Sequence, residues 1–136
     1  MTYLTAVWTI VAIASSASAQ LQTRVVALTG QQAAGAEPGV VYSLMATSPV
    51  IGQGGHVAFQ ATLAGDGVNN DNRNGVWTAF GGSIQLAARE GLQAVGTSSG
   101  VVYDFFDSGM AVGASGTAAF EGFLRGTGIH NDNHRG

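Results

Sequence analysis

The loop formed by residues 66–75, DGVNNDNRNG, has the clearest spacing for chemistry in this sequence. Three asparagines alternate along it before a glycine, which imitates the oxygen ligands and turn glycine of a calcium-binding loop: Asn70, Asn72, Asn74 and Gly75. A strong calcium site uses several carboxylates, whereas these positions offer amide oxygens, and both aspartates of the loop fall off the pattern. Two interpretations remain: a weak calcium site at the three asparagines or, as we favour, a loop whose side chains cap their own backbone.

A second candidate is the motif Asp104-Phe105-Phe106-Asp107, in which two acids flank two aromatic residues. Paired carboxylates are the groups that hydrolyse glycosidic bonds. The motif occurs once in the chain, and solvated acids beside core aromatic residues are far more common than a catalytic pair. We therefore expect no catalytic residue in this chain.

Histidine, cysteine and net charge offer no further site. His56, His130 and His134 lack a carboxylate or third ligand at the spacing of a zinc site, and we interpret them as surface residues. The absence of cysteine excludes thiolate chemistry, cysteine-based metal sites and disulfides. The net charge of −3 is spread along the chain and gives no basic patch for nucleic acid.

The elements that position these residues belong to a unit that occurs twice, 61 residues apart. Residues 24–75 align without a gap with residues 85–136, and 20 of the 52 pairs are identical. Self-similarity at a fixed period is the signature of a repeat protein. We therefore define unit 1 as residues 24–84 and unit 2 as residues 85–136. Unit 2 lacks the hairpin that closes unit 1, so we interpret the chain as a fragment of a longer array or the product of a truncated gene.

Short apolar runs bounded by Gly, Asn, Asp and Ser predict β-strands. In unit 1 the expected strands cover residues 40–44, 49–51, 56–63, 76–80 and 83–89. Gly81 and Gly82 can adopt the positive φ values of a type I′ or II′ turn, so they predict a hairpin between the last two strands. Each unit is expected to hold about four antiparallel strands.

Such a small sheet cannot bury both faces alone, and stacking sheets radially is the economical solution. We expect an all-β fold of tandem four-stranded antiparallel units that resemble β-propeller blades, with a β-sandwich made from both units as the alternative. The aromatic residues on alternating strand positions are predicted to pack in the core between blades rather than to form a sugar-binding platform: Tyr42, Phe59, Trp77, Tyr103 and Phe120.

The first 19 residues predict a secretory signal peptide. An apolar stretch over residues 4–14 precedes Ala17-Ser18-Ala19, the pattern that signal peptidase cleaves, so Gln20 would begin the mature chain. At about 11 residues the stretch is shorter than the roughly 20 that cross a bilayer. We therefore expect a secreted or extracytoplasmic protein, in the periplasm or at the cell surface. The β-repeat region would span residues 20–136, without a membrane span in the mature chain.

Several short elements resemble known repeat families. The segments 49–59 (PVIGQGGHVAF) and 110–120 (MAVGASGTAAF) are similar to the turn-plus-strand element of TolB-type propeller repeats. The whole unit resembles an uncharacterised family of exported bacterial tandem-repeat proteins, which often carry a C-terminal surface-sorting anchor. That match rests on AREG (88–91), AVG (94–96), GVVY (100–103), VAFQATL (57–63) and NGVW (74–77). The resemblance implies export and a propeller-like fold, and it brings no known activity.

Together these features predict an exported β-repeat module that binds an extracellular ligand or has a structural role, with other repeats of the same or another chain as partners. Two alternatives remain open. One is a fragment of a secreted propeller hydrolase or lyase whose catalytic residues lie in other repeats, and the other is a calcium-dependent surface adhesin.

Overall fold

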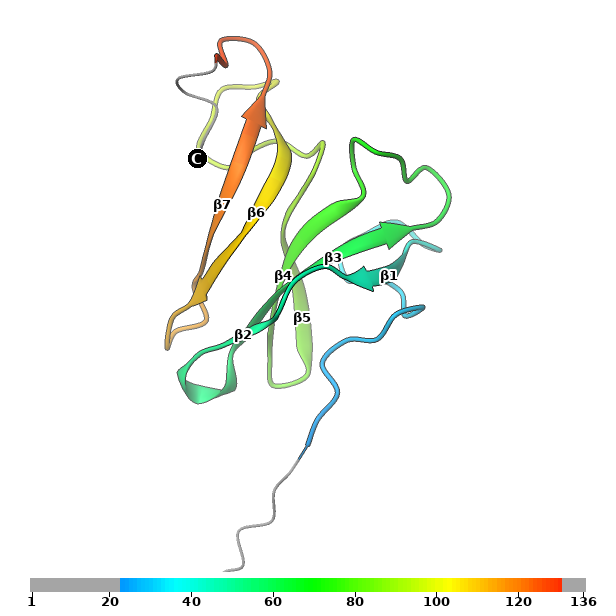
Figure 1. Ribbon diagram of the computed structural model, residues 1–136, viewed down its shortest axis with the longest axis vertical. Coiled ribbons are helices and arrows are strands. Elements are labelled where there is room, and N and C mark those ends of the chain that lie inside the picture. Colours follow the sequence, from blue (N-terminus) through cyan, green and yellow to red (C-terminus); the bar gives the residue numbers. More distant parts are fainter. Residues whose placement is uncertain (1–22, 131–136) are drawn as a thin grey trace, which may run out of the picture.

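The computed structural model describes residues 23–130 (Figure 1), and these residues form two antiparallel β-sheets. The strands are β1 (Val41–Met45), β2 (Val50–Ile51), β3 (Val57–Ala64), β4 (Asn74–Phe80), β5 (Ser83–Arg89), β6 (Val102–Val112) and β7 (Ala118–Arg125). Within the described part, the sole helical element is a single 3-10 turn, Gln53–Gly55. The predicted all-β class is therefore confirmed. The predicted signal peptide lies outside the described residues.

The sheet of unit 1 has the order β1-β3-β4-β5, in which most of β5 is the first segment of unit 2, and the short strand β2 also pairs with β3. The predicted strands agree with these elements to within one or two residues. Gly81 and Gly82 have φ angles of 60° and 96°, and Phe80 lies opposite Ser83 across them. Positive φ at both central residues is the requirement of a type I′ turn, so the predicted hairpin between β4 and β5 is confirmed.

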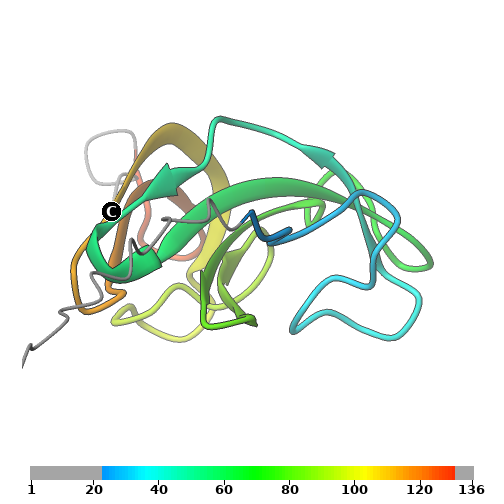
Figure 2. The same cartoon turned by 90° about the horizontal axis from the view of Figure 1, so that it is seen from below.

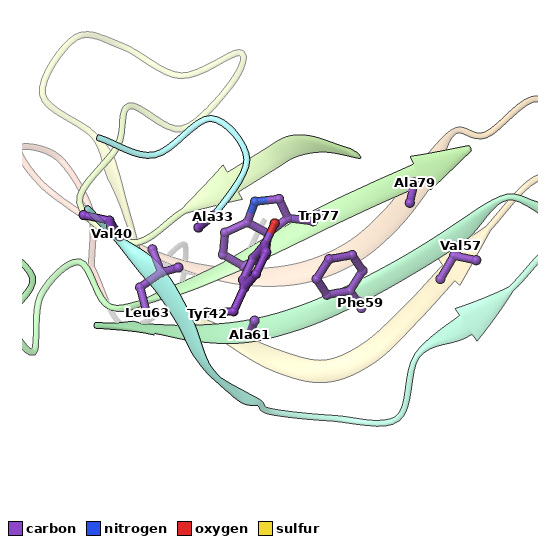
Figure 3. Close-up of a cluster of buried hydrophobic side chains, with 9 residues drawn as sticks. All are labelled: Ala33, Val40, Tyr42, Val57, Phe59, Ala61, Leu63, Trp77 and Ala79. Carbon is purple, nitrogen blue, oxygen red and sulfur yellow. The ribbon is translucent and has the colours of Figure 1, made fainter. Parts of the chain in front are cut away.

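One face of this sheet carries an aromatic cluster formed by Tyr42, Phe59 and Trp77 (Figure 3). The ring centroids of Trp77 and Tyr42 lie 5.1 Å apart at 82°, and those of Trp77 and Phe59 lie 5.9 Å apart at 16°. The indole N–H donates a 2.9 Å hydrogen bond to the carbonyl oxygen of Ala34, so the buried polar atom has a partner. The prediction that these three residues are core residues is confirmed, but the cluster lies within unit 1 and not between blades.

The opposite face of the same sheet, which we call the far face, holds Ala58, Gln60 and Val76. Ala58 and Val76 are fully buried and Gln60 is 6% exposed. Strand β6 of unit 2 contacts β2, β3 and β4, and the side-chain amide of Gln60 donates to the carbonyl oxygen of Asp107 in β6. In both views the ribbon of β6 and β7 lies beside the larger sheet (Figures 1 and 2). Strand β3 is thus buried on both faces.

Equivalent backbone hydrogen bonds occur in the two units. Gly30 N donates to Tyr42 O at 2.7 Å, and the counterpart Gly91 N donates to Tyr103 O at 2.9 Å. Gly65 and its counterpart both have a φ of 141°. A Cβ at Gly65 would lie 2.6 Å from a backbone oxygen, so only glycine permits this approach of two segments.

The units differ where unit 1 has two strands, β1 and β2, and unit 2 has the single long strand β6. Pro49, just before β2, has Met110 as its counterpart within β6. The sheets remain open within the described residues, so they do not show a closed propeller ring.

Candidate functional site at the junction of the two units

The loop between β3 and β4 contains the asparagines predicted as calcium ligands. The side-chain oxygen of Asn72 accepts a 2.8 Å hydrogen bond from Asn69 N, and its amide nitrogen donates to Gly67 O at 3.0 Å. The side-chain oxygen of Asn69 accepts from Asp71 N at 2.8 Å. Asparagines that bond to their own backbone in this way define a turn, which is the interpretation favoured from sequence.

Asn74 lies at the start of β4 and holds this loop to the beginning of unit 2. Its side-chain oxygen accepts a 2.8 Å hydrogen bond from the hydroxyl of Thr62. Its side-chain nitrogen and its backbone N–H donate to the two carboxylate oxygens of Glu90, at 2.8 and 2.9 Å. Glu90 is only 2% exposed. A buried carboxylate needs such donors, because a charge without partners in the interior is costly.

Arg89 precedes Glu90 and is 4% exposed. Its Nε donates a 2.7 Å hydrogen bond to the backbone oxygen of Asn72, and its Nη1 forms a 2.7 Å ion pair with the carboxylate of Glu37. The hydrogen bond from Arg89 lowers the pKa of the Glu37 carboxyl from its ordinary value. Arg89 therefore connects the β3–β4 loop to the turn that precedes β1.

We call these five residues the repeat junction: Glu37, Asn72, Asn74, Arg89 and Glu90. Sequence reasoning selected the two asparagines and gave no role to Glu37, Arg89 or Glu90. A signal existed, because only 10% of the chain is charged and an adjacent Arg-Glu pair ends a predicted strand. In a chain with so few charges, two neighbouring charges at a strand end indicate a specific polar contact.

The remaining candidates take different places. Asn70 is exposed in the β3–β4 loop, whereas the oxygens of Asn72 and Asn74 already accept hydrogen bonds. Among residues 23–130, no group of three His, Asp or Glu side chains is arranged to hold a metal ion. A calcium site at the three asparagines stays a prediction.

The two acids of the DFFD motif have separate partners. Asp104 forms a 3.0 Å ion pair with Arg125 on β7. Asp107 accepts a 2.6 Å hydrogen bond from Ser108 N. Of the two rings between them, Phe105 stacks on Phe123 at 3.9 Å on one side of the ribbon. The other ring, Phe106, packs against Tyr103 and Phe120.

The histidines do not gather at one place in the described residues. The ring of His56 stacks on Phe80 with centroids 4.1 Å apart, at the end of β4. His130 is exposed after β7, and His134 lies outside the described residues.

This chain belongs to a family of unknown function (DUF7453), whose family model matches residues 7–136. No curated protein and no solved structure matches the chain. Within the described range of residues, no helix is long and apolar enough to span a membrane.

Proposed function

We propose that this protein is an exported β-repeat module, propeller-like in arrangement, that acts as a binding or structural element outside the cytoplasm. Its two units stack on each other, and the chain has no enzymatic activity of its own. The observation that carries the proposal is the packing of β6 on the far face of the unit 1 sheet, next to the repeat junction. Each unit supplies one face to cover its neighbour and one face to be covered.

Burial supports this interpretation. Val76 and Ala58 are fully buried on the far face, although a lone four-stranded sheet would leave such residues in contact with water. Burying apolar area at about 25 cal/mol per Å² is the main stabilising contribution when repeats stack. The repeat junction also fixes the orientation of unit 2, because Arg89 and Glu90 bond to two separate segments of unit 1: the turn at Glu37 and the end of the β3–β4 loop at Asn72 and Asn74.

A third unit tests the proposal. Gly75 and Gly136 are equivalent, so a second copy of residues 76–136 joined after Gly136 continues the 61-residue period. We expect this three-unit chain to be monomeric, to unfold in one transition and to melt at a higher temperature than the two-unit chain. A matched control carries the same added residues in scrambled order. Separate transitions, or no gain over the control, would contradict stacking of repeats.

The location is tested by expressing the full chain with its first 19 residues in a bacterial host. Mass spectrometry of the exported product should show a chain that begins at Gln20. Replacing Ala17 and Ala19 with bulky residues should block processing, since signal peptidase accepts small residues there. An unprocessed chain retained in the cytoplasm would contradict export.

A further inference from the structure

We propose that the outer edge of β7 is an acceptor for a tryptophan-bearing β-strand supplied by another β-repeat unit. The edge and the rings beside it form the strand acceptor, which comprises Ala118, Phe120, Tyr103 and Phe106. The proposal rests on the proposed function and deepens it, because it names the chemistry of the partner. Its template is unit 1, where the equivalent edge of β3 is occupied by β4.

In unit 1 the occupant of this position is visible. Strand β4 runs antiparallel to β3, with Trp77 opposite Phe59 and Ala79 opposite Val57. The indole packs against the rings of Phe59 and Tyr42 and is completely buried. The site for the tryptophan is therefore made by a tyrosine of one strand and a phenylalanine of the next.

Unit 2 contains the same two rings. Tyr103 and Phe120 have centroids 6.2 Å apart, compared with 5.9 Å for Tyr42 and Phe59. Tyr103 is held by the same hydrogen bond as Tyr42, since each hydroxyl accepts from a backbone N–H eight residues earlier, at 3.3 and 3.1 Å. Both rings of unit 2 remain half-buried, whereas those of unit 1 are at most 4% exposed.

The backbone of β7 is oriented for the same pairing. In an antiparallel sheet, alternate residues turn their N–H and C=O toward the same neighbour. Leu63 N donates to Arg73 O on the β4 side of β3. The backbone N–H and C=O groups of Val57 and Phe59 therefore also point toward β4. Their counterparts Ala118 and Phe120 face away from β6, and in the described residues the second sheet contains β6 and β7 alone.

The geometry of β4 also defines what the occupant must carry. A Cβ at Gly75 would lie 2.7 Å from the Cη2 atom of Trp77, so glycine is required two residues before the tryptophan. Ala34, whose carbonyl accepts the indole N–H, has Val95 as its counterpart, and Val95 is 83% exposed. An incoming strand of the type Gly-apolar-Trp fits these constraints. Adding a strand to an exposed edge is a common mode of peptide recognition.

The test uses a labelled peptide with the sequence of residues 74–89, which holds β4, its turn and β5. Fluorescence anisotropy should show saturable binding to the full chain. The Trp77→Ala peptide should bind about tenfold more weakly or worse, because a buried tryptophan is the commonest anchor of an interface. The Phe80→Ala peptide is the matched control and should bind within about twofold of the original, since Phe80 packs on His56, whose counterpart is Thr117.

Variants of the full chain locate the site. Phe120→Ala should weaken binding of the original peptide about tenfold, whereas Phe105→Ala should not, because Phe105 is 45% exposed and stacks on the other side of the ribbon. Circular dichroism confirms that both variants fold. The peptide series with the unaltered chain gives a result even where Phe120→Ala fails to fold.

Three outcomes would overturn the acceptor: no binding of the original peptide, equal binding of the Trp77→Ala peptide, or a dimer in light scattering that Phe120→Ala abolishes and Phe105→Ala does not. The last would assign the edge to a second copy. If the peptide fails and a three-unit chain whose added tryptophan is replaced by alanine still gains stability over the scrambled control, the acceptor is wrong and the proposed function stands. If both fail, stacking of repeats is wrong as well.

Discussion

Unit 1 and unit 2 have equivalent backbone hydrogen bonds but bury their aromatic residues to different extents. Tyr42 and Phe59 are 0% and 4% exposed, whereas Tyr103 and Phe120 are half-buried. The difference follows from β4, which adds Trp77 to the cluster in unit 1. Turns and local hydrogen bonds therefore define the frame of a unit, while a fourth strand completes its core.

The units also differ at their first residues. Arg89 and Glu90 of unit 2 are buried against the β3–β4 loop, whereas their counterparts Leu28 and Thr29 are exposed. The charged pair therefore occurs at the position where one unit contacts the loop of the unit before it. Its contribution depends on the neighbour, in contrast to the aromatic cluster, which lies within one unit.

The largest expected effect is at Trp77, the residue by which the core of unit 1 differs from that of unit 2. Trp77→Ala should lower the free energy of unfolding by about 3–5 kcal/mol, because it leaves a cavity in the cluster and removes the bond to Ala34. Phe105→Ala in unit 2 is the control, and its cost should stay below about 1 kcal/mol. Urea unfolding measures both. Equal losses would contradict the difference between the cores.

The repeat junction gives the next largest effect. Glu90→Ala leaves the side-chain and backbone donors of Asn74 without partners in a partly buried place, so it should cost about 2 kcal/mol. Thr29→Ala at the equivalent position of unit 1 should cost less than about 0.5 kcal/mol. Thermal unfolding followed by circular dichroism compares the two variants. A similarly small loss of stability in both variants would contradict a structural role for Glu90.

A smaller difference between the units is expected at the hydroxyl groups of Tyr42 and Tyr103. Tyr42→Phe leaves Ala34 N without its acceptor and should cost about 1 kcal/mol. Tyr103→Phe removes the longer hydrogen bond from Val95 N. Because Val95 is exposed to water, the loss of unfolding free energy should be smaller. Urea titration of both variants decides the order. The reverse order would show that unit 2 is the better packed one.

The smallest effect concerns pH. The pKa of Glu37 is lowered in the folded chain by its hydrogen bond with Arg89, so its contribution to stability is present above the unfolded value and is lost as pH falls through the folded value. Below about pH 4.5 the free energy of unfolding should fall less steeply in Glu37→Gln than in the original chain. Its counterpart is Ser98, and Ser98→Ala should leave this pH dependence unchanged. Identical slopes for Glu37→Gln and the original chain would exclude the ion pair as the cause.

Local sequence signals predicted most of unit 1. The hairpin at Gly81 and Gly82 follows from backbone sterics, and β3 follows from a run of apolar residues with high strand propensity. The strand pattern did not predict which residues would be buried on the far face, because Ala58 and Gln60 are covered by β6, a segment distant in sequence.

The candidate site was predicted less completely for the same reason. The spacing of Asn72 and Asn74 is local, and it marked the correct loop. Arg89 and Glu90 act on that loop from about 16 residues away, across the β4–β5 hairpin. A pairing of this kind depends on the sheet register, which a linear pattern does not contain.

The most direct test of the central claim is native-state hydrogen exchange at equivalent positions of β3 and β7. We predict that the amides of Ala118 and Phe120 exchange at least about a hundredfold faster than those of Val57 and Phe59, and that the peptide of residues 74–89 slows them. Equal protection in both strands without the peptide would contradict the account, because it would mean that the edge of β7 is already paired.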